Sequence, residues 1–284
     1  MRVDLHVVSL QDGPGGQPMD DVSSTTTQGI ARITIERPQS RNALRERTCN
    51  ELRAAIEAAS ADSKVRVLLL SGRGDAFCAG ADLTDPDFFS KPGDRRENLE
   101  RHVGQVFQSI VRAIAASRVP TLAVMTGSAV GFGFDLACAC DLRVCVDTAK
   151  VGPTFQRLGL VPDGGGTFTL PRLIGPTRAL EWILSGRTRL ASEVESWGLF
   201  NRVVTAAALD GAVEELLQML LEGPPLAMSQ ARRLVRAAAS SDLDSALDAE
   251  RDAQVELLLS QDFSEGITAF FERRPPRFTG AADD

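Results

Sequence analysis

Two glycine-containing turns in this chain are built so that backbone N–H groups could contact a bound ligand. The first follows the apolar run Val67–Leu70 and passes through the small residues Cys78–Ala81. The second, Gly127–Gly133, has the same order of apolar run, glycine turn and expected helix start. Small side chains let a ligand approach the backbone itself, so the contacting groups would be N–H donors. Two such turns brought together could direct two N–H groups at one oxygen, which is the chemistry of an oxyanion hole.

Carboxylates are the remaining candidates for acid–base chemistry. The chain has only two histidines and no tyrosine. His6 lies near the N-terminus and His102 in an expected polar helix, so Ser-His-Asp and Cys-His hydrolase mechanisms are disfavoured. Asp135 follows the second turn and Asp163 lies in a glycine-rich segment. Each could instead be structural, Asp135 as an acid in a helix first turn and Asp163 as an Asp-Gly turn former.

Composition excludes several classes of function. A net charge of −7 argues against a nucleic-acid binder, which must neutralise phosphates. The chain has no apolar run of about 18 residues, so no membrane span is predicted, and its N-terminus does not resemble a secretory signal. The five cysteines are odd in number and lie in apolar context, which favours buried reduced thiols over disulfides or a zinc site. We therefore expect a cytoplasmic protein without a bound metal.

Several segments, taken together and in order, resemble the crotonase (enoyl-CoA hydratase/isomerase) superfamily. They cover roughly residues 29–280 and are specific for the family, but much less so for the reaction. The segments are Arg37-Pro38 with Asn42-Ala43-Leu44, Phe77–Leu83, Gly127–Gly133, Gly159–Thr167, and Phe270–Arg274 with Phe278.

The resemblance implies an α/β fold, a spiral of ββα turns followed by a helical C-terminal oligomerisation region. We expect residues 1–28 to be a mobile N-terminal extension, 29–205 the catalytic core and 206–284 the helical region. The family builds trimers from such helices, often paired into hexamers, so a homotrimer or a dimer of trimers is expected. The segment 85–98 is expected either to cover the acyl pocket or to be a solvated loop.

The resemblance also implies site residues and a ligand. The N–H groups of Ala81 and Phe132 would hold the carbonyl oxygen of an acyl-CoA thioester, although most family members have glycine in place of Phe132. Coenzyme A is part of the substrate, and no further cofactor or metal is needed. Arg273, Arg274 and Arg277 would either meet a CoA phosphate or form a solvated basic tail. The residues expected to contact the substrate are Ser40, Arg41, Ala79, Ala81, Asp82, Leu83 and Phe132.

Three positions bear on the reaction. Asp135 stands where the family has its first catalytic glutamate and is one methylene shorter. Phe155 stands where hydratases have the second glutamate, and a phenyl ring can neither activate water nor donate a proton. Asp163 resembles the aspartate of isomerase branches. The expected activity is therefore movement of an enoyl-CoA double bond by Asp163 with help from Asp135. The alternatives are an enoyl-CoA hydratase and a non-catalytic acyl-CoA-binding homologue.

Overall fold

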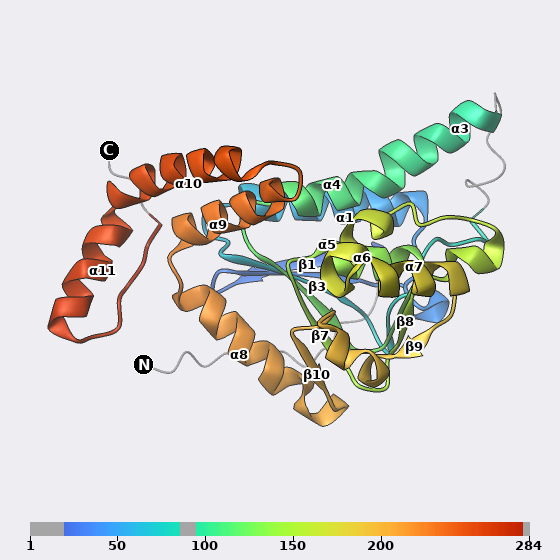
Figure 1. Ribbon diagram of the computed structural model, residues 1–284. Helices are drawn as coiled ribbons and strands as arrows, with labels where there is room; N and C mark the ends of the chain where they lie inside the picture. Colours follow the sequence, from blue (N-terminus) through green and yellow to red (C-terminus); the bar gives the residue numbers. More distant parts are fainter. Residues whose placement is uncertain (1–19, 86–94, 281–284) are drawn as a thin grey trace.

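The described residues, 20–85 and 95–280 of the computed structural model, form two sheets surrounded by helices (Figure 1). The larger sheet has the strand order β1-β2-β3-β5-β7-β10, and the smaller has the order β4-β6-β8-β9. The first sheet comprises β1 (Val22–Thr27), β2 (Ile30–Ile35), β3 (Val67–Gly72), β5 (Thr121–Met125), β7 (Leu142–Val146) and β10 (Arg202–Val204). The second comprises β4 (Ala76–Cys78), β6 (Ser128–Val130), β8 (Lys150–Gly152) and β9 (Arg189–Leu190).

The chain winds as a spiral in which each turn gives one strand to each sheet. β3 enters the large sheet and β4 the small one, and the pairs β5–β6 and β7–β8 repeat this order. β3, β5 and β7 pair in parallel, as do β4, β6 and β8. Helices follow each pair, so successive turns stack in register. The predicted spiral of ββα turns is confirmed.

Apolar periodicity explains how the elements form and pack. β3 and β5 are buried along their whole length, as expected for parallel strands covered on both faces. α1 (Glu46–Ala61) buries Leu52, Ile56 and Ala59 at helical spacing, and it packs against the large sheet. α8 (Leu209–Glu222) also packs against this sheet through five buried side chains. Figure 1 shows α1 and α8 on opposite sides of the strands.

The helices that matter for the site lie along the spiral. They are α3 (Arg95–Arg101), the π-helical segment η2 (His102–Phe107), α4 (Gln108–Ala116), α5 (Phe132–Ala139), α6 (Gly166–Ile174) and α7 (Pro176–Ser185). Helical structure runs from Arg95 to Ala116, with a π-helical segment in its middle that the sequence pattern did not indicate. His102 is buried, contrary to the expected polar helix.

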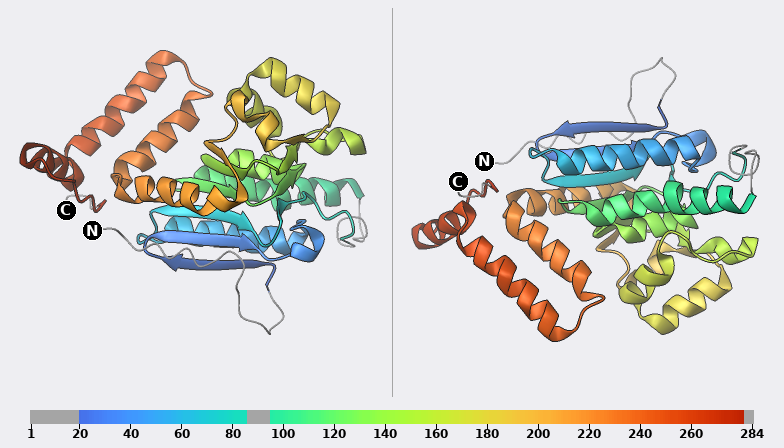
Figure 2. Two further views of the ribbon diagram at one scale, coloured as in Figure 1. Left: turned by 90° about the horizontal axis from the view of Figure 1, so that it is seen from below. Right: turned by 90° about the horizontal axis from the view of Figure 1, so that it is seen from above.

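The C-terminal helices α9 (Pro225–Ala238), α10 (Leu243–Leu258) and α11 (Gln261–Glu272) extend away from the sheets (Figures 1 and 2). α9 has no buried residue and α10 has only one, Ala253. The expected C-terminal helices are present: α8 packs on the large sheet, and α9–α11 follow it.

The expected N-terminal extension was wrong for residues 22–27. They form β1, which pairs antiparallel with β2 along its full length, from Val22 opposite Ile35 to Thr27 opposite Ile30. The sequence did not predict this strand, because its serines and threonines are exposed and only Val22 is partly buried, so no apolar alternation marks it. Residues 1–19 lie outside the described residues, as does most of the expected loop at 85–98.

None of the helices in the described ranges has the length and apolar composition required to cross a membrane.

Candidate active site

Gly80 brings the first glycine turn against the start of α5. Its φ is +92°, and a Cβ at this position would lie 3.0 Å from Val130 O and 3.3 Å from Phe132 N. Only glycine allows this approach without displacing the backbone. The peptide that follows Gly80 carries the Ala81 N–H, so this group lies next to the N-terminus of α5.

Hydrogen bonds to Leu44 fix the direction of the Ala81 N–H. Leu44 N donates to Gly80 O and Asp82 N donates to Leu44 O, both at 2.8 Å. Successive peptide groups of extended backbone point to opposite sides. The N–H of Ala81 therefore faces away from Leu44.

The Phe132 N–H is the second candidate donor. Phe132 is the first residue of α5, where backbone N–H groups have no acceptor within the helix. Gly131 precedes it with a φ of +55° and turns the chain from β6 into the helix. Within the described part of the chain, neither Ala81 N–H nor Phe132 N–H donates a hydrogen bond. Both donors remain available to one external oxygen, at the positive end of the α5 dipole.

Asp135 lies one helical turn beyond Phe132 and is almost completely buried. Gly164 N donates to its Oδ2 at 3.1 Å. A Cβ on Gly166 would lie 2.3 Å from Asp135 Oδ1, so the glycines of this turn make room for the carboxyl group. The sequence pattern predicted only a glycine-rich turn at 159–166. In the structure, Gly164 and Gly166 of this turn enclose the Asp135 carboxyl group.

Asp163 lies in the same turn, near enough to Asp135 for its charge to act on that carboxyl group. Burial is the main cause that raises the pKa of Asp135 to about 7, and the charge of Asp163 also raises it. The N–H groups of Gly164 and Gly166 act in the opposite direction and lower this pKa. Burial also raises the pKa of Asp163. The charge of Asp163 therefore adds to the effect of burial and favours the protonated form of Asp135.

Each of the two acids has one buried oxygen without a hydrogen-bond partner. These oxygens are Asp135 Oδ1 and Asp163 Oδ1, as far as the described residues reach. Buried polar atoms are normally paired, so such oxygens mark places where a ligand or its exchanging proton would lie. The structure thus brings together Ala81, Phe132, Asp135 and Asp163, which are far apart in the sequence.

The Phe132 ring lies beside the turn that encloses Asp135, because a Cβ on Gly164 would be 3.0 Å from Phe132 Cε2 and 2.7 Å from Asp135 Cβ. The Phe132 ring is buried and packs edge-on against Phe107, with ring centroids 5.0 Å apart and an interplanar angle of 78°. Phe155 is also buried, 8% exposed, in the 3-10 helix Thr154–Leu158. The sequence analysis missed Phe107, and its signal was an apolar position at helical spacing before Ile110.

The expected CoA-contacting residues lie in the loop 37–44 and in the segment that runs beside it. Ala79 N donates to Arg41 O at 3.0 Å, so Ala79 and Arg41 are neighbours. Arg41 is exposed and Ser40 half-buried. Leu83 is 48% exposed, which suits an apolar ligand contact.

Asp82 has a structural role that the sequence analysis did not foresee. Arg37 Nη2 donates to its Oδ2 at 2.9 Å, and Thr84 N and Oγ1 donate to its Oδ1 at 3.0 and 2.6 Å. Burial, Thr84 and Arg37 all act on its pKa, and the net result is a lowered value. Its carboxylate is therefore engaged in holding the loop.

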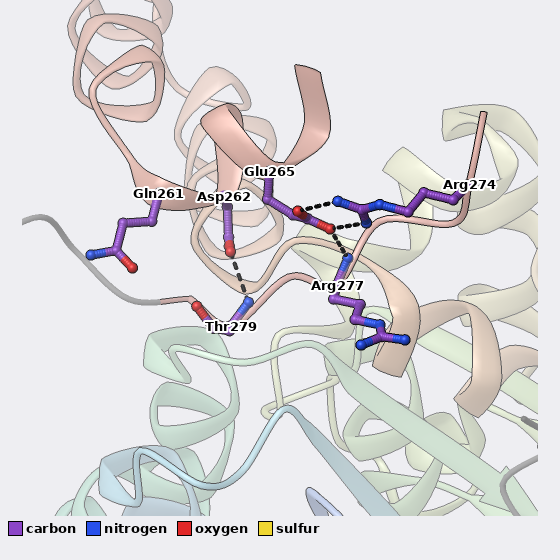
Figure 3. Close-up of a pocket in the computed structure, with 6 residues that line it drawn as sticks. All are labelled: Gln261, Asp262, Glu265, Arg274, Arg277 and Thr279. Carbon is purple, nitrogen blue, oxygen red and sulfur yellow. Dashed lines mark hydrogen bonds and ion pairs between the residues drawn. The ribbon is translucent and has the colours of Figure 1, made fainter. Parts of the chain in front are cut away.

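A separate cavity of about 530 Å³ lies among the C-terminal residues, at the end of the molecule away from α5 and α6 (Figures 1 and 3). Arg274 pairs there with Glu265 at 2.6 and 2.8 Å, and lowers the pKa of that carboxyl to about 2. Figure 3 shows the guanidinium of Arg277 directed away from Glu265. Of the predicted basic residues, Arg274 is thus occupied by an acid of its own chain. No cluster of metal-ligating side chains is found in residues 20–85 and 95–280.

Comparisons with known proteins show the family and the fold of this chain. A family model described as enoyl-CoA hydratase/isomerase matches residues 25–281. The 1,2-epoxyphenylacetyl-CoA isomerase of Escherichia coli strain K12 is 32% identical over 262 residues, covering 92% of this chain and 99% of that protein. A protein named probable enoyl-CoA hydratase from Rhodobacter capsulatus is 35% identical over 254 residues, covering 89% of this chain and 96% of that protein. Among solved structures, an enoyl-CoA hydratase from Bacillus anthracis matches with a TM-score of 0.85 at 30% identity, covering 92% of this chain and all of that chain.

Proposed function

Because this chain belongs to the enoyl-CoA hydratase/isomerase family, and is thus a crotonase-type enzyme that processes acyl-CoA thioesters, we propose that it moves the double bond of an enoyl-CoA. The observation that supports isomerisation is the burial of Asp135, whose pKa the charge of Asp163 helps to raise. Phe155, at the position where the family's hydratases have their second glutamate, cannot exchange protons. A single base that moves one proton between two carbons is sufficient for this reaction. Hydration needs a second group that activates water.

The proposed reaction begins with the thioester carbonyl oxygen accepting hydrogen bonds from Ala81 N–H and Phe132 N–H. The Asp163 carboxylate removes a proton from C2 of a 3-enoyl-CoA, and the electron pair moves to the thioester oxygen as a dienolate. The two N–H groups and the α5 dipole stabilise that charge. Protonated Asp163 then returns the proton to C4, which leaves the double bond between C2 and C3. No atom is gained or lost, and no metal or redox cofactor takes part.

Asp135 assists as a neutral acid in this proposal. It is the more buried of the two, and its pKa of about 7 keeps it largely protonated in mildly acidic solution. A neutral neighbour leaves Asp163 as the only negative charge beside the developing enolate. Gly164 N–H holds Asp135 Oδ2 in place, so the proton can occupy the otherwise unpartnered Oδ1.

The first prediction distinguishes isomerisation from hydration. With 2-enoyl-CoA and 3-enoyl-CoA in heavy-oxygen water, we expect the enzyme to interconvert the two without label entering the product. Product mass measures this directly. Labelled 3-hydroxyacyl-CoA as the main product would establish hydration instead, with Asp135 holding the water and Asp163 replacing the missing glutamate. Hydratases among the relatives make this the second candidate.

The second prediction concerns assembly. We propose a homotrimer or a dimer of trimers, because many large apolar side chains of α9–α11 are exposed, as at surfaces that bind another protein. We expect size-exclusion chromatography with light scattering to give three or six times the chain mass of 30.5 kDa. A stable monomer at micromolar concentration would contradict the proposal. The most exposed of these apolar side chains are Val235, Leu243, Leu259, Phe270 and Phe271, all at least 70% exposed.

A cytoplasmic location is proposed from the state of the cysteines. All five are free and buried, which suits a reducing compartment.

A further inference from the structure

Helix α4 contacts the acid pair through one amide side chain, that of Gln108. Gln108 is the first residue of α4, directly after the π-helical segment η2. Its Nε2 donates to the backbone oxygen of Asp163 at 3.1 Å. Within the described ranges, no other group donates to that oxygen. Gln108 therefore connects α4 to the turn that contains Asp163.

The peptide between Asp163 and Gly164 is held at both ends. Its carbonyl oxygen accepts from Gln108, and its N–H donates to Asp135 Oδ2 at 3.1 Å. A hydrogen bond to the oxygen of a peptide polarises it and strengthens its N–H as a donor. The amide of Gln108 is therefore connected through one peptide to the carboxyl group of Asp135, and the same peptide sets the position of Asp163.

Arg112 fixes the orientation of the Gln108 amide. Its Nη2 donates to Gln108 Oε1 at 3.1 Å, and its Nη1 donates to Gly104 O at 2.7 Å. A guanidinium has no acceptor, so the amide oxygen must face it and the NH₂ group must face Asp163. Gly104 belongs to η2, so this chain of hydrogen bonds also joins the π-helical segment to the acid pair.

Two apolar contacts of the same helix lie beside this hydrogen bond. The Phe107 ring packs on Phe132, and Val111 lies against Gly165, where a Cβ would approach its Cγ1 at 3.9 Å. Phe107, Gln108 and Val111 share one face of the helix by their spacing. π-helical segments are frequent at functional sites. Here the segment ends at the residue that precedes Gln108.

We propose that Gln108 is a positioning residue that holds the Asp163–Gly164 peptide so that both aspartates keep their relative orientation. This inference rests on the proposed function only for its effect on turnover. Its structural part concerns one peptide and can be measured without substrate. Arg112 acts through Gln108 and should show the same effects, less strongly.

The substrate-free experiment is hydrogen–deuterium exchange of the segment around Gly164, followed by mass spectrometry. In Gln108→Leu the Gly164 N–H should exchange roughly three- to tenfold faster, the range that one net hydrogen bond supports. Gln105→Leu is the matched control, because Gln105 is exposed on η2 and makes none of these contacts. Unchanged exchange in Gln108→Leu would overturn the proposal.

The kinetic experiment uses the pH profile. Loss of Gln108 weakens the Gly164 N–H bond to Asp135, so the pKa of that acid should rise and the alkaline limb of activity should move to higher pH. kcat should fall roughly three- to tenfold, with KM nearly unchanged, because the ligand-binding loops are untouched. The charged or titratable groups around Asp135 are Asp163, Cys138 on its own helix, and Arg112 behind Gln108.

The outcomes separate the two proposals. If the wild type isomerises its substrate but Gln108→Leu changes neither exchange nor the alkaline limb, the positioning role is wrong and the reaction stands. If exchange at Gly164 accelerates but the wild type hydrates its substrate, the positioning role stands and the reaction is wrong. Should Gln108→Leu fail to fold, Arg112→Leu serves in its place, and an unchanged exchange rate there would overturn the proposal.

Discussion

Replacement of Asp163 by Asn should reduce isomerisation at least about a hundredfold, the usual minimum for losing a general acid–base group. Asn has nearly the same size, and the backbone oxygen at 163 would still accept from Gln108, so the turn should keep its form. The loss should appear in kcat, because the thioester oxygen is still held by Ala81 and Phe132. Steady-state kinetics with 3-enoyl-CoA measures it.

The control for this variant is Asp210→Asn, an exposed aspartate in the first turn of α8. It changes the net charge equally and should leave turnover unaffected. Circular dichroism and a thermal melt would establish that Asp163→Asn is folded. If the folded variant kept its rate, the acid–base role would have to pass to Asp135.

Replacement of Asp135 by Asn should stabilise the protein in alkaline solution. The pKa of Asp135 is higher in the folded state than in the unfolded chain. Below the pKa of the unfolded chain, the acid is protonated in both states and does not lower the free energy of unfolding. As the pH rises from about 4 to about 7, the unfolded chain ionises first and the folded state is progressively destabilised. Above pH 7 the full penalty is present, on the order of 4 kcal/mol if the whole pKa shift is counted.

The Asp135→Asn side chain would remove this penalty and still accept the Gly164 hydrogen bond. We therefore expect a melting temperature higher than that of the wild type by several degrees at pH 8, and by much less at pH 4. Calorimetry at one fixed protein concentration would measure it, since assembly makes melting concentration-dependent. A stability difference independent of pH would contradict the buried, raised pKa.

The same variant separates the roles of the two acids in catalysis. With the side chain at position 135 neutral at every pH, the fall of wild-type activity near pH 7 should be absent from the Asp135→Asn profile. The acidic limb, which belongs to Asp163, should remain. A profile that keeps its alkaline limb would show that another group causes it.

Local patterns in the sequence were sufficient to predict the family and most of the helices and strands. The two predicted glycine turns are found where the sequence placed them, because the positive φ of Gly80 and Gly131 allows the close backbone approach that these turns require. Ala81, Phe132, Asp135 and Asp163 were all named from motifs. In the structure these four gather at one place because the spiral stacks its turns.

Other features depended on tertiary contacts that no local pattern encodes. β1 carries mostly serine and threonine, so its pairing with β2 decided that it is a strand. α8 has the same apolar periodicity as a projecting helix, and only its position against β3 and β7 made it part of the core. Asp82 has the sequence of a ligand-binding position, whereas its side chain is engaged by Arg37 from 45 residues away.

The acid pair shows this division most clearly. The sequence identified two aspartates 28 residues apart and could give each a structural or a chemical role with similar weight. The burial of Asp135, the effect of the Asp163 charge on its pKa and the hydrogen bond from Gln108 follow from α4, α5 and the 163–166 turn meeting in space. A pKa depends on solvent and charge within a few ångströms, and those surroundings come from segments far apart in the chain.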